Sequence, residues 1–295
     1  GSGIQRAVGD SRRPLYFLIV CCVLNIVLDL LFVLVFRMGV AGVAIATTLA
    51  QAVSAMLVCA SLGRSKDIYR LEMRRVRLDR VMTRETIRIG LPSGLQSVLF
   101  SLSNILITTS INGFGTSTVA AWVALGKVDA MNWMIVGAFG VSVTTFVGQN
   151  YGARRYERVS KSMRVCMVLC EATTILFSLL AVCFSRQIFS LFTQDEEVLE
   201  TSIRMLNFMV KCYWLYVPIE MISGTLRGTG NVLVPTMITA LGICGIRVVW
   251  MLAVVPHWHV LESIMFSYPF SWILTSLAFV VYYLKTRKRL LPAQE

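Results

Sequence analysis

Charged residues and histidines are both scarce in this sequence. Only 15% of its 295 residues are charged and only two are histidine, so few side chains could act as acid–base groups or metal ligands. No His-Glu-x-x-His, Gly-x-Ser-x-Gly or Cys-x-x-Cys motif occurs, although these are frequent signatures of metalloproteases, serine hydrolases and redox proteins. The eight cysteines lie inside apolar runs, where we expect small buried side chains. These absences argue against an enzyme and against a bound metal or cofactor.

Apolar residues make up 56% of the chain, and its mean hydropathy is +0.69. A helix needs about 20 mostly apolar residues to cross a bilayer, so the long apolar runs are candidate spans. We therefore predict an all-α membrane protein with eight transmembrane helices, located in the cell membrane. The eight runs are Tyr16–Phe36, Val40–Leu62, Ile89–Ile111, Val119–Val147, Val165–Phe184, Ile203–Ile222, Val232–Val255 and Ile264–Leu284.

The formal net charge of +12 is distributed unevenly along the chain. Of the 28 lysines and arginines, 22 lie in residues 1–15, 63–88, 149–164, at Arg227 or after residue 284. If the helices alternate in direction, all five segments lie on one side of the membrane. Positive charge gathers in cytoplasmic loops, so both termini of the chain are predicted to be cytoplasmic. Little positive charge is left to bind nucleic acid, and we expect none to be bound.

A short internal repeat relates the two ends of the chain. Residues 2–14 (SGIQRAVGDSRRP) align without gaps to residues 223–235 (SGTLRGTGNVLVP) at a constant offset of 221. Each copy precedes two apolar runs, but four further runs precede the second copy and none precedes the first. By this symmetry we expect about 130 residues, with four helices, to be missing from the N-terminus. The complete molecule would be two six-helix bundles, an architecture of secondary transporters.

This symmetry predicts four parts in the chain. Residues 1–62 would be the last two helices of the first bundle, and residues 89–284 the complete second bundle. Between them, residues 63–88 would form a basic, partly helical cytoplasmic linker that binds anionic lipid headgroups. Residues 285–295 would be a cytoplasmic tail.

Four sequence stretches resemble one known family, the multidrug and toxic compound extrusion (MATE) transporters. They are GLPSGLQ (90–96), TVAAW (118–122), GQNYGA (148–153) and LRGTG (226–230). The resemblance covers the whole chain, which would correspond to the fifth through twelfth helices of a twelve-helix protein. It implies export of small organic, often cationic, compounds by Na⁺ or H⁺ antiport, while two lobes alternate access to a central cavity. We expect the protein to be a monomer.

Three polar residues of the first two runs are candidate cation ligands. Asn25 and Asp29 are four residues apart and share one helical face. Asp29 and Thr47 each lie seven residues from the outer end of their run, so both are expected about 10 Å below the outer surface. Carboxylate, amide and hydroxyl oxygens suit Na⁺, and the carboxylate alone could carry a proton. The three also look like the cation-site residues of the DinF-type branch, although that branch's acidic partner on the first helix is absent here. A structural hydrogen bond is the alternative role of Asp29.

The second bundle contains further polar and aromatic residues that we expect to line a substrate cavity. Lys127, Lys211 and Arg247 each lie eight residues from the outer end of their runs, which places them at a common depth of about 12 Å. Such a layer predicts that zwitterionic or anionic substrates are tolerated, unless some of these side chains extend outward to the interface. The full predicted set is Gln96, Asn104, Trp122, Lys127, Asp129, Lys211, Glu220 and Arg247.

A proline is expected to disturb the sixth apolar run. Pro218 removes a backbone donor and frees a carbonyl near Trp214, which predicts a kink or hinge. Glu220 follows it and is either a second protonation site or an interfacial residue. Phe100 and Tyr216 stand near places where some branches of the family have acidic residues, which favours Asp29 as the coupling group.

Other functions remain open at this point. A lipid-linked oligosaccharide flippase would share the helix architecture, and a cationic layer would suit a pyrophosphate. A truncated chain without activity is a further possibility. His257 and His259 are too isolated to form a metal site, so the only ion expected is the coupling Na⁺ or H⁺.

Overall fold

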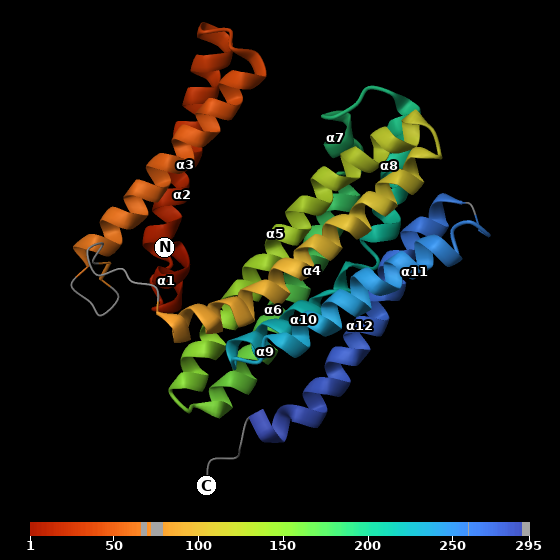
Figure 1. The fold of residues 1–295 in the computed structure, drawn as a ribbon. Helices are drawn as coiled ribbons and strands as arrows, with labels where there is room; N and C mark the ends of the chain where they lie inside the picture. The colour runs from red at the N-terminus through yellow and green to blue at the C-terminus, as the bar shows by residue number, and fades with distance from the viewer. Residues whose placement is uncertain (66–69, 72–78, 259, 291–295) are drawn as a thin grey trace. The chain divides into compact units, whose positions relative to one another are not determined.

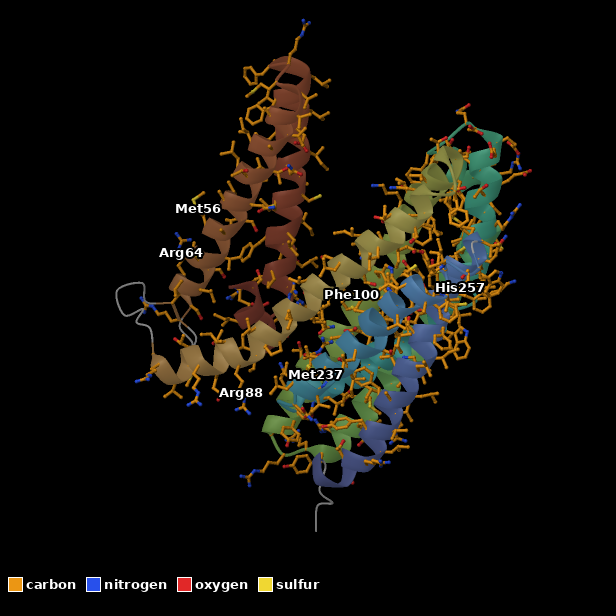
Figure 2. All side chains as sticks on the ribbon, turned by 45° about the vertical axis from the view of Figure 1, so that its right-hand side comes forward. Met56, Arg64, Arg88, Phe100, Met237 and His257 are labelled. Atoms are coloured by element: carbon orange, nitrogen blue, oxygen red, sulfur yellow. The ribbon has the colours of Figure 1, made fainter. Side chains whose placement is uncertain are left out.

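The computed structural model describes residues 1–65, 70–71, 79–258 and 260–290, and every regular element in these residues is helical (Figure 1). The chain divides into two compact units, Gly1–Met82 and Thr83–Glu295. The outer surfaces carry many large apolar side chains (Figure 2), among them Met56 at 62% exposure and Met237 at 54%. Exposed apolar surface on this scale is typical of helices that face lipid.

The first unit is a helical hairpin. A short α1 (Ser2–Ala7) precedes α2 (Arg12–Leu30), which continues as a π-helix, η1 (Leu31–Val35), and α3 (Gly39–Arg64) returns alongside α2. Gly42, Ala46 and Ala50 are spaced four residues apart on α3 and are all buried. Small residues at this spacing let two membrane helices approach closely, so they favour the packing of α3 along α2 and η1.

The second unit contains the other helices. Its centre is α5, which packs against α6, α8 and α9. The elements are α4 (Arg80–Asn112), α5 (Thr116–Gly152), α6 (Tyr156–Cys183), α7 (Ser185–Ser190), α8 (Glu196–Met209), η3 (Tyr213–Leu215), α9 (Val217–Gly228), α10 (Leu233–Thr239), the π-helix η4 (Ala240–Gly245), α11 (Ile246–Ala253) and α12 (Leu261–Leu290).

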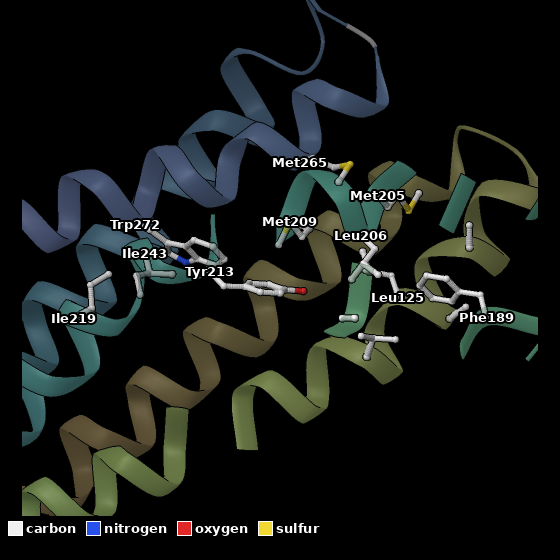
Figure 3. Packing of buried hydrophobic residues seen from close by; sticks show 14 of the residues in the cluster. Leu125, Phe189, Met205, Leu206, Met209, Tyr213, Ile219, Ile243, Met265 and Trp272 are labelled. Atoms are coloured by element: carbon white, nitrogen blue, oxygen red, sulfur yellow. The ribbon is translucent and has the colours of Figure 1, made fainter. Parts of the chain in front are cut away.

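The main core of this unit joins α5 to the helices that follow it (Figure 3). Leu125 of α5, Phe189 of α7, Leu206 of α8 and Trp272 of α12 are each at most 1% exposed. Tyr213, in the short segment η3, is completely buried in the same cluster. The core therefore fixes η3 against α5 and α12, and this position matters for the site described below.

The seam between α5 and α9 depends on glycine. A Cβ atom at Gly228 would lie 2.7 Å from the Thr144 carbonyl oxygen, and one at Gly224 would lie 2.7 Å from Val143 Cγ1. The Thr144 hydroxyl donates across the seam to the Gly224 carbonyl oxygen at 3.1 Å. The backbones of the two helices are thus in direct contact, and no larger residue fits between them.

The predicted count of eight spanning helices is not confirmed. Within the described residues, seven helices are long and apolar enough to cross a membrane. The remaining apolar run, Ile203–Ile222, is interrupted, because α8 ends at Met209 and α9 begins at Val217. Pro218 lies in the first turn of α9, where its missing N–H group is tolerated. The proline therefore starts a new helix instead of kinking a continuous one.

The two copies of the sequence repeat have the same backbone geometry. Gly9 and Gly230 both have a positive φ, of 91° and 87°, which a residue without a Cβ atom adopts easily. Each ends a helix with the same pair of hydrogen bonds, a pattern known as a Schellman motif. After each motif the next helix starts at a matching position, α2 at Arg12 and α10 at Leu233. The bonds are Gly9 N to Arg6 O (2.9 Å), Asp10 N to Gln5 O (2.9 Å), Gly230 N to Arg227 O (3.0 Å) and Asn231 N to Leu226 O (3.0 Å).

The predicted linker and tail are partly helical. The helix α4 begins at Arg80, so residues 80–88 of the predicted linker belong to it, and α12 continues to Leu290 within the predicted tail. Residues 66–69, 72–78 and 291–295, together with His259, lie outside the described part of the chain. The division into two bundles, a linker and a tail stays a prediction.

Candidate functional site

The first candidate site lies inside the hairpin of α2 and α3. The Asn25 amide nitrogen of α2 donates a hydrogen bond to the Thr47 hydroxyl of α3 at 3.4 Å. This bond uses the NH₂ group of the amide, so its carbonyl oxygen remains available as an acceptor. Two of the three predicted cation ligands are thus neighbours in the structure.

Asp29 lies one helical turn from this pair along α2. Asn25, not Asp29, is opposite Thr47, so the depth estimated from the sequence is shifted by about one turn. The Asp29 Oδ1 atom is buried and has no hydrogen-bond partner among the described residues. A buried carboxylate oxygen without a donor costs free energy, and an added proton or cation would remove that cost.

The chemistry of the hairpin suits a light cation or a proton better than a transition metal. Its candidate ligands are one carboxylate, one amide oxygen and one hydroxyl, which are hard donors. In the part of the chain that the structure describes, no three His, Cys, Asp or Glu side chains gather closely enough to hold a metal ion.

The second candidate site is a cavity of about 480 Å³ within the second unit. It lies among α4, α5, the break before α9, α11 and α12. Four predicted cavity residues line it, namely Asn104, Trp122, Asp129 and Arg247. The other lining residues are Phe100, Ile107, Thr108, Leu125, Gly126, Ala130, Trp133, Tyr216 and Tyr268.

Helical spacing explains how α4 presents its polar side chains to the cavity. Phe100, Asn104 and Thr108 are four residues apart and therefore share one face. Gln96 continues the same face one turn earlier, but it does not line the cavity. Gln96 therefore lies on the matching face of α4 but one turn away from this cavity, and its role as a substrate-cavity residue stays a prediction.

Aromatic rings form one wall of the cavity. Trp133 meets Tyr216 edge to face with 4.7 Å between ring centroids, and Trp122 lies 6.1 Å from Tyr268. Behind them, the buried Trp272 contacts Trp133, Tyr216 and Tyr268 at 5.7–5.8 Å. These contacts hold the rings in place, so the shape of the wall is largely preformed.

Asp129 has a hydrogen-bond donor from the interrupted helix. The Tyr213 hydroxyl donates to its Oδ1 atom, and Tyr213 lies in η3, immediately before the start of α9. The sequence signal for this contact was the proline at 218, which indicated a disturbed helix but not which side chain would turn inward. Tyr213 is therefore a site residue that the sequence analysis missed.

Arg247 is the positive group of the cavity. Its side chain is almost fully buried, with a residue exposure of 4%. Its Cζ atom lies 4.0 Å from the centroid of the Tyr268 ring, and its Nε atom donates to the Ser271 hydroxyl at 3.3 Å. None of the ion pairs between described residues includes Arg247.

The other predicted cavity residues lie elsewhere. Lys127 is exposed, because it is two residues from Asp129 and roughly 200° around the helix. Lys211 borders a separate groove next to α6. Glu220 forms an ion pair with Arg227 at 2.8 Å. The predicted layer of three cations therefore does not gather around this cavity, which holds Arg247 alone of the three.

The contact between Tyr213 and Asp129 gives a testable stability prediction. Tyr213→Phe removes the hydroxyl that Asp129 accepts from, so we expect the free energy of unfolding to fall by about 1–3 kcal/mol. SDS titration in mixed micelles measures this change. Tyr283→Phe is the matched control, because Tyr283 is also a buried residue but its hydroxyl makes no hydrogen bond among the described residues, and the substitution should change stability by less than about 0.5 kcal/mol. Equal effects of the two substitutions would contradict the prediction.

Comparisons with known proteins extend along most of the chain. The family model described as MatE matches residues 92–252. The probable multidrug resistance protein YoeA of Bacillus subtilis is 29% identical over 287 residues, which are 94% of this chain and 62% of that protein. The probable multidrug resistance protein NorM of Thermotoga maritima is 25% identical over 82% of this chain and 53% of its own length. A solved structure of a MOP superfamily transporter from Pyrococcus furiosus has the same fold, with a TM-score of 0.87 over 99% of this chain and 66% of that one at 20% identity.

Proposed function

Because this chain belongs to the MatE family of membrane transporters, which are not enzymes, we propose that it exports small organic compounds by Na⁺ or H⁺ antiport with alternating access. The chain spans about 62% of the length of YoeA, so the proposal concerns the activity of the protein to which this chain contributes. The names of both relatives support multidrug export. They do not favour the lipid-linked oligosaccharide flippase.

The observation that carries the coupling mechanism is the unpartnered carboxylate oxygen of Asp29. An ionisable group inside a membrane is costly unless it is neutralised. Binding of Na⁺ or a proton at Asp29 neutralises it, and the Asn25 and Thr47 oxygens one turn away supply further hard ligands for Na⁺. Release of the ion restores the uncompensated charge. The occupied and empty states of this group therefore differ enough in free energy to bias a conformational equilibrium.

The cavity of the second unit is the proposed substrate chamber. Its volume of about 480 Å³ lies within the range of roughly 300–1,000 Å³ that is usual for small-molecule sites. Trp122 and Trp133 offer ring faces to organic compounds, including cations. Asn104, Asp129 and Arg247 offer polar groups that would fix the orientation of a substrate.

The chain is a multi-pass membrane protein, and we propose that both of its termini are cytoplasmic. The support is the concentration of basic residues in alternate connections, since such residues mark the cytoplasmic side. We further propose a monomer in contact with anionic lipids along the basic segments.

An efflux assay tests the proposed function. Vesicles containing the protein are loaded with ethidium, and either a Na⁺ gradient or a pH gradient is imposed in the direction of antiport. We expect one of the two gradients to make ethidium efflux several times faster than in vesicles without protein. The gradient that acts identifies the coupling ion. Efflux that neither gradient changes would contradict the proposal and favour a chain without transport activity.

A further inference from the structure

Arg247 is a buried cation that forms no ion pair with any of the described residues. Its exposure of 4% excludes a side chain that extends outward to water. A guanidinium held inside an apolar unit is expensive unless an anion compensates it. Among the described residues that line the cavity, Asp129 alone is acidic, and its Oδ1 atom already accepts the hydrogen bond of Tyr213.

The contacts of the Arg247 side chain fix how it faces the cavity. The Nε atom donates to Ser271, and the face of the guanidinium lies over the Tyr268 ring. The two Nη atoms have no hydrogen-bond partner among the described residues, and they are not enclosed by protein atoms either. Since Arg247 lines the cavity, these NH₂ groups are the donors that it presents there.

The π-helix η4 helps to hold Arg247 in this position. η4 ends at Gly245, two residues before Arg247, and α11 carries on from it. A Cβ atom at Gly242 would overlap the side chain of Thr275 on α12, so η4 lies directly against α12. This close approach brings Arg247 beside Tyr268 and Ser271. The site is therefore built into the packing of the second unit.

A planar anion matches the donors that remain. Two parallel N–H groups of a guanidinium bind a carboxylate in a bidentate manner. The aromatic wall beside Arg247 suits a flat ring attached to that carboxylate. We propose that the cavity binds aromatic carboxylates, with the carboxylate on the Arg247 Nη atoms and the ring against the aromatic wall of the cavity. This inference rests on the proposed function, because it names a substrate class for the same cavity.

Three ligands of one shape test the proposal on the unaltered protein. They are 2-naphthoate, the neutral 2-naphthamide and the cationic 2-naphthylmethylammonium. Their dissociation constants are measured by equilibrium dialysis against the protein in nanodiscs of uncharged lipid, with empty nanodiscs as the blank. We expect 2-naphthoate to bind roughly 10- to 100-fold more tightly than 2-naphthamide, because a hydrogen-bonded charge is worth that much. Equal binding of the two, or preference for the cation, would overturn the proposal.

Variants then test whether Arg247 is the source of the preference. Arg247→Gln should abolish the preference for 2-naphthoate and leave 2-naphthamide binding within a few-fold. Arg247→Lys keeps the charge but loses the bidentate geometry, so it should retain only part of the preference. Arg164→Gln, which removes an exposed cation of α6 away from the cavity, should retain all of it. A preference that survives in Arg247→Gln would overturn the proposal.

The outcomes separate this inference from the proposed function. If gradient-driven ethidium efflux is observed but 2-naphthoate binds no more tightly than 2-naphthamide, the carboxylate site is wrong and the proposed antiport is unaffected. If 2-naphthoate is clearly preferred but no gradient drives efflux, the carboxylate site is supported and the proposed antiport is contradicted. If Arg247→Gln fails to elute as a single folded species, the ligand series on the unaltered protein and on Arg247→Lys still decides the question.

Discussion

Replacement of Asp29 by asparagine is expected to abolish gradient-driven export while leaving the folded protein in the membrane. Asparagine has nearly the same shape as aspartate, but it can neither carry a proton nor offer a negative charge to Na⁺. Because the Asp29 Oδ1 atom has no donor to lose among the described residues, the substitution should not weaken packing. Removal of a buried charge should leave the thermal midpoint unchanged or raise it.

The measurement combines ethidium efflux under an imposed gradient with the thermal midpoint of the purified protein. Efflux by Asp29→Asn should equal that of vesicles without protein. Glu85→Gln, which alters an exposed carboxylate of α4, should retain full efflux. The alternative role of Asp29 as a structural hydrogen-bonding group makes the opposite prediction. In that case the midpoint would fall and the remaining folded protein would still export.

Introduction of a methyl group at Gly228 is expected to cost about 1–3 kcal/mol of unfolding free energy. The Cβ atom of Gly228→Ala would lie 2.7 Å from the Thr144 carbonyl oxygen and 2.8 Å from Val147 Cγ1. The carbonyl belongs to the backbone of α5, so it cannot rotate away as a side chain would. The two helices must separate, and the hydrogen bond from Thr144 to Gly224 would lengthen. Gly228→Leu should prevent recovery of folded protein altogether.

Gly137→Ala is the matched control for this prediction. Gly137 also lies in α5, but no atom of a neighbouring helix in the described structure lies within 4 Å of the place that its Cβ would take. Alanine there should leave stability unchanged or raise it by up to about 1 kcal/mol. Unfolding free energies from SDS titration compare the two variants. If Gly228→Ala lowers the free energy of unfolding no more than Gly137→Ala does, the tight contact between α5 and α9 is disproved.

The positions of the spanning helices were largely predictable from the sequence, because length and apolar composition decide them in lipid. The interruption at residues 210–216 was not. Pro218 indicates a local disturbance, but a proline is compatible with a kink, a hinge or the start of a helix. Which of these forms depends on tertiary contacts such as those of the buried Tyr213.

The candidate sites were predictable in composition more than in geometry. Asn25, Asp29 and Thr47 stand out because polar groups in apolar runs are costly. Their relative depth depends on how the turn between α2 and α3 is made, and the π-helix η1 lies just before that turn. In the second unit, counting residues from the helix ends predicted the depth of Lys127 in the membrane but not the side of the helix from which it projects. Lys127 and Asp129 have similar depths but project from different sides of α5.

The matching turns at Gly9 and Gly230 show how far the residues around one backbone path can differ. Only five of the thirteen aligned residues are identical, yet the backbone path is the same in both. The buried residue seven positions before the start of the next helix differs in chemistry, since Gln5 donates to Ser61 in one copy and Leu226 is wholly apolar in the other. One backbone path thus accommodates either a polar or an apolar buried side chain, because the glycine and the backbone hydrogen bonds that define the turn do not depend on that side chain.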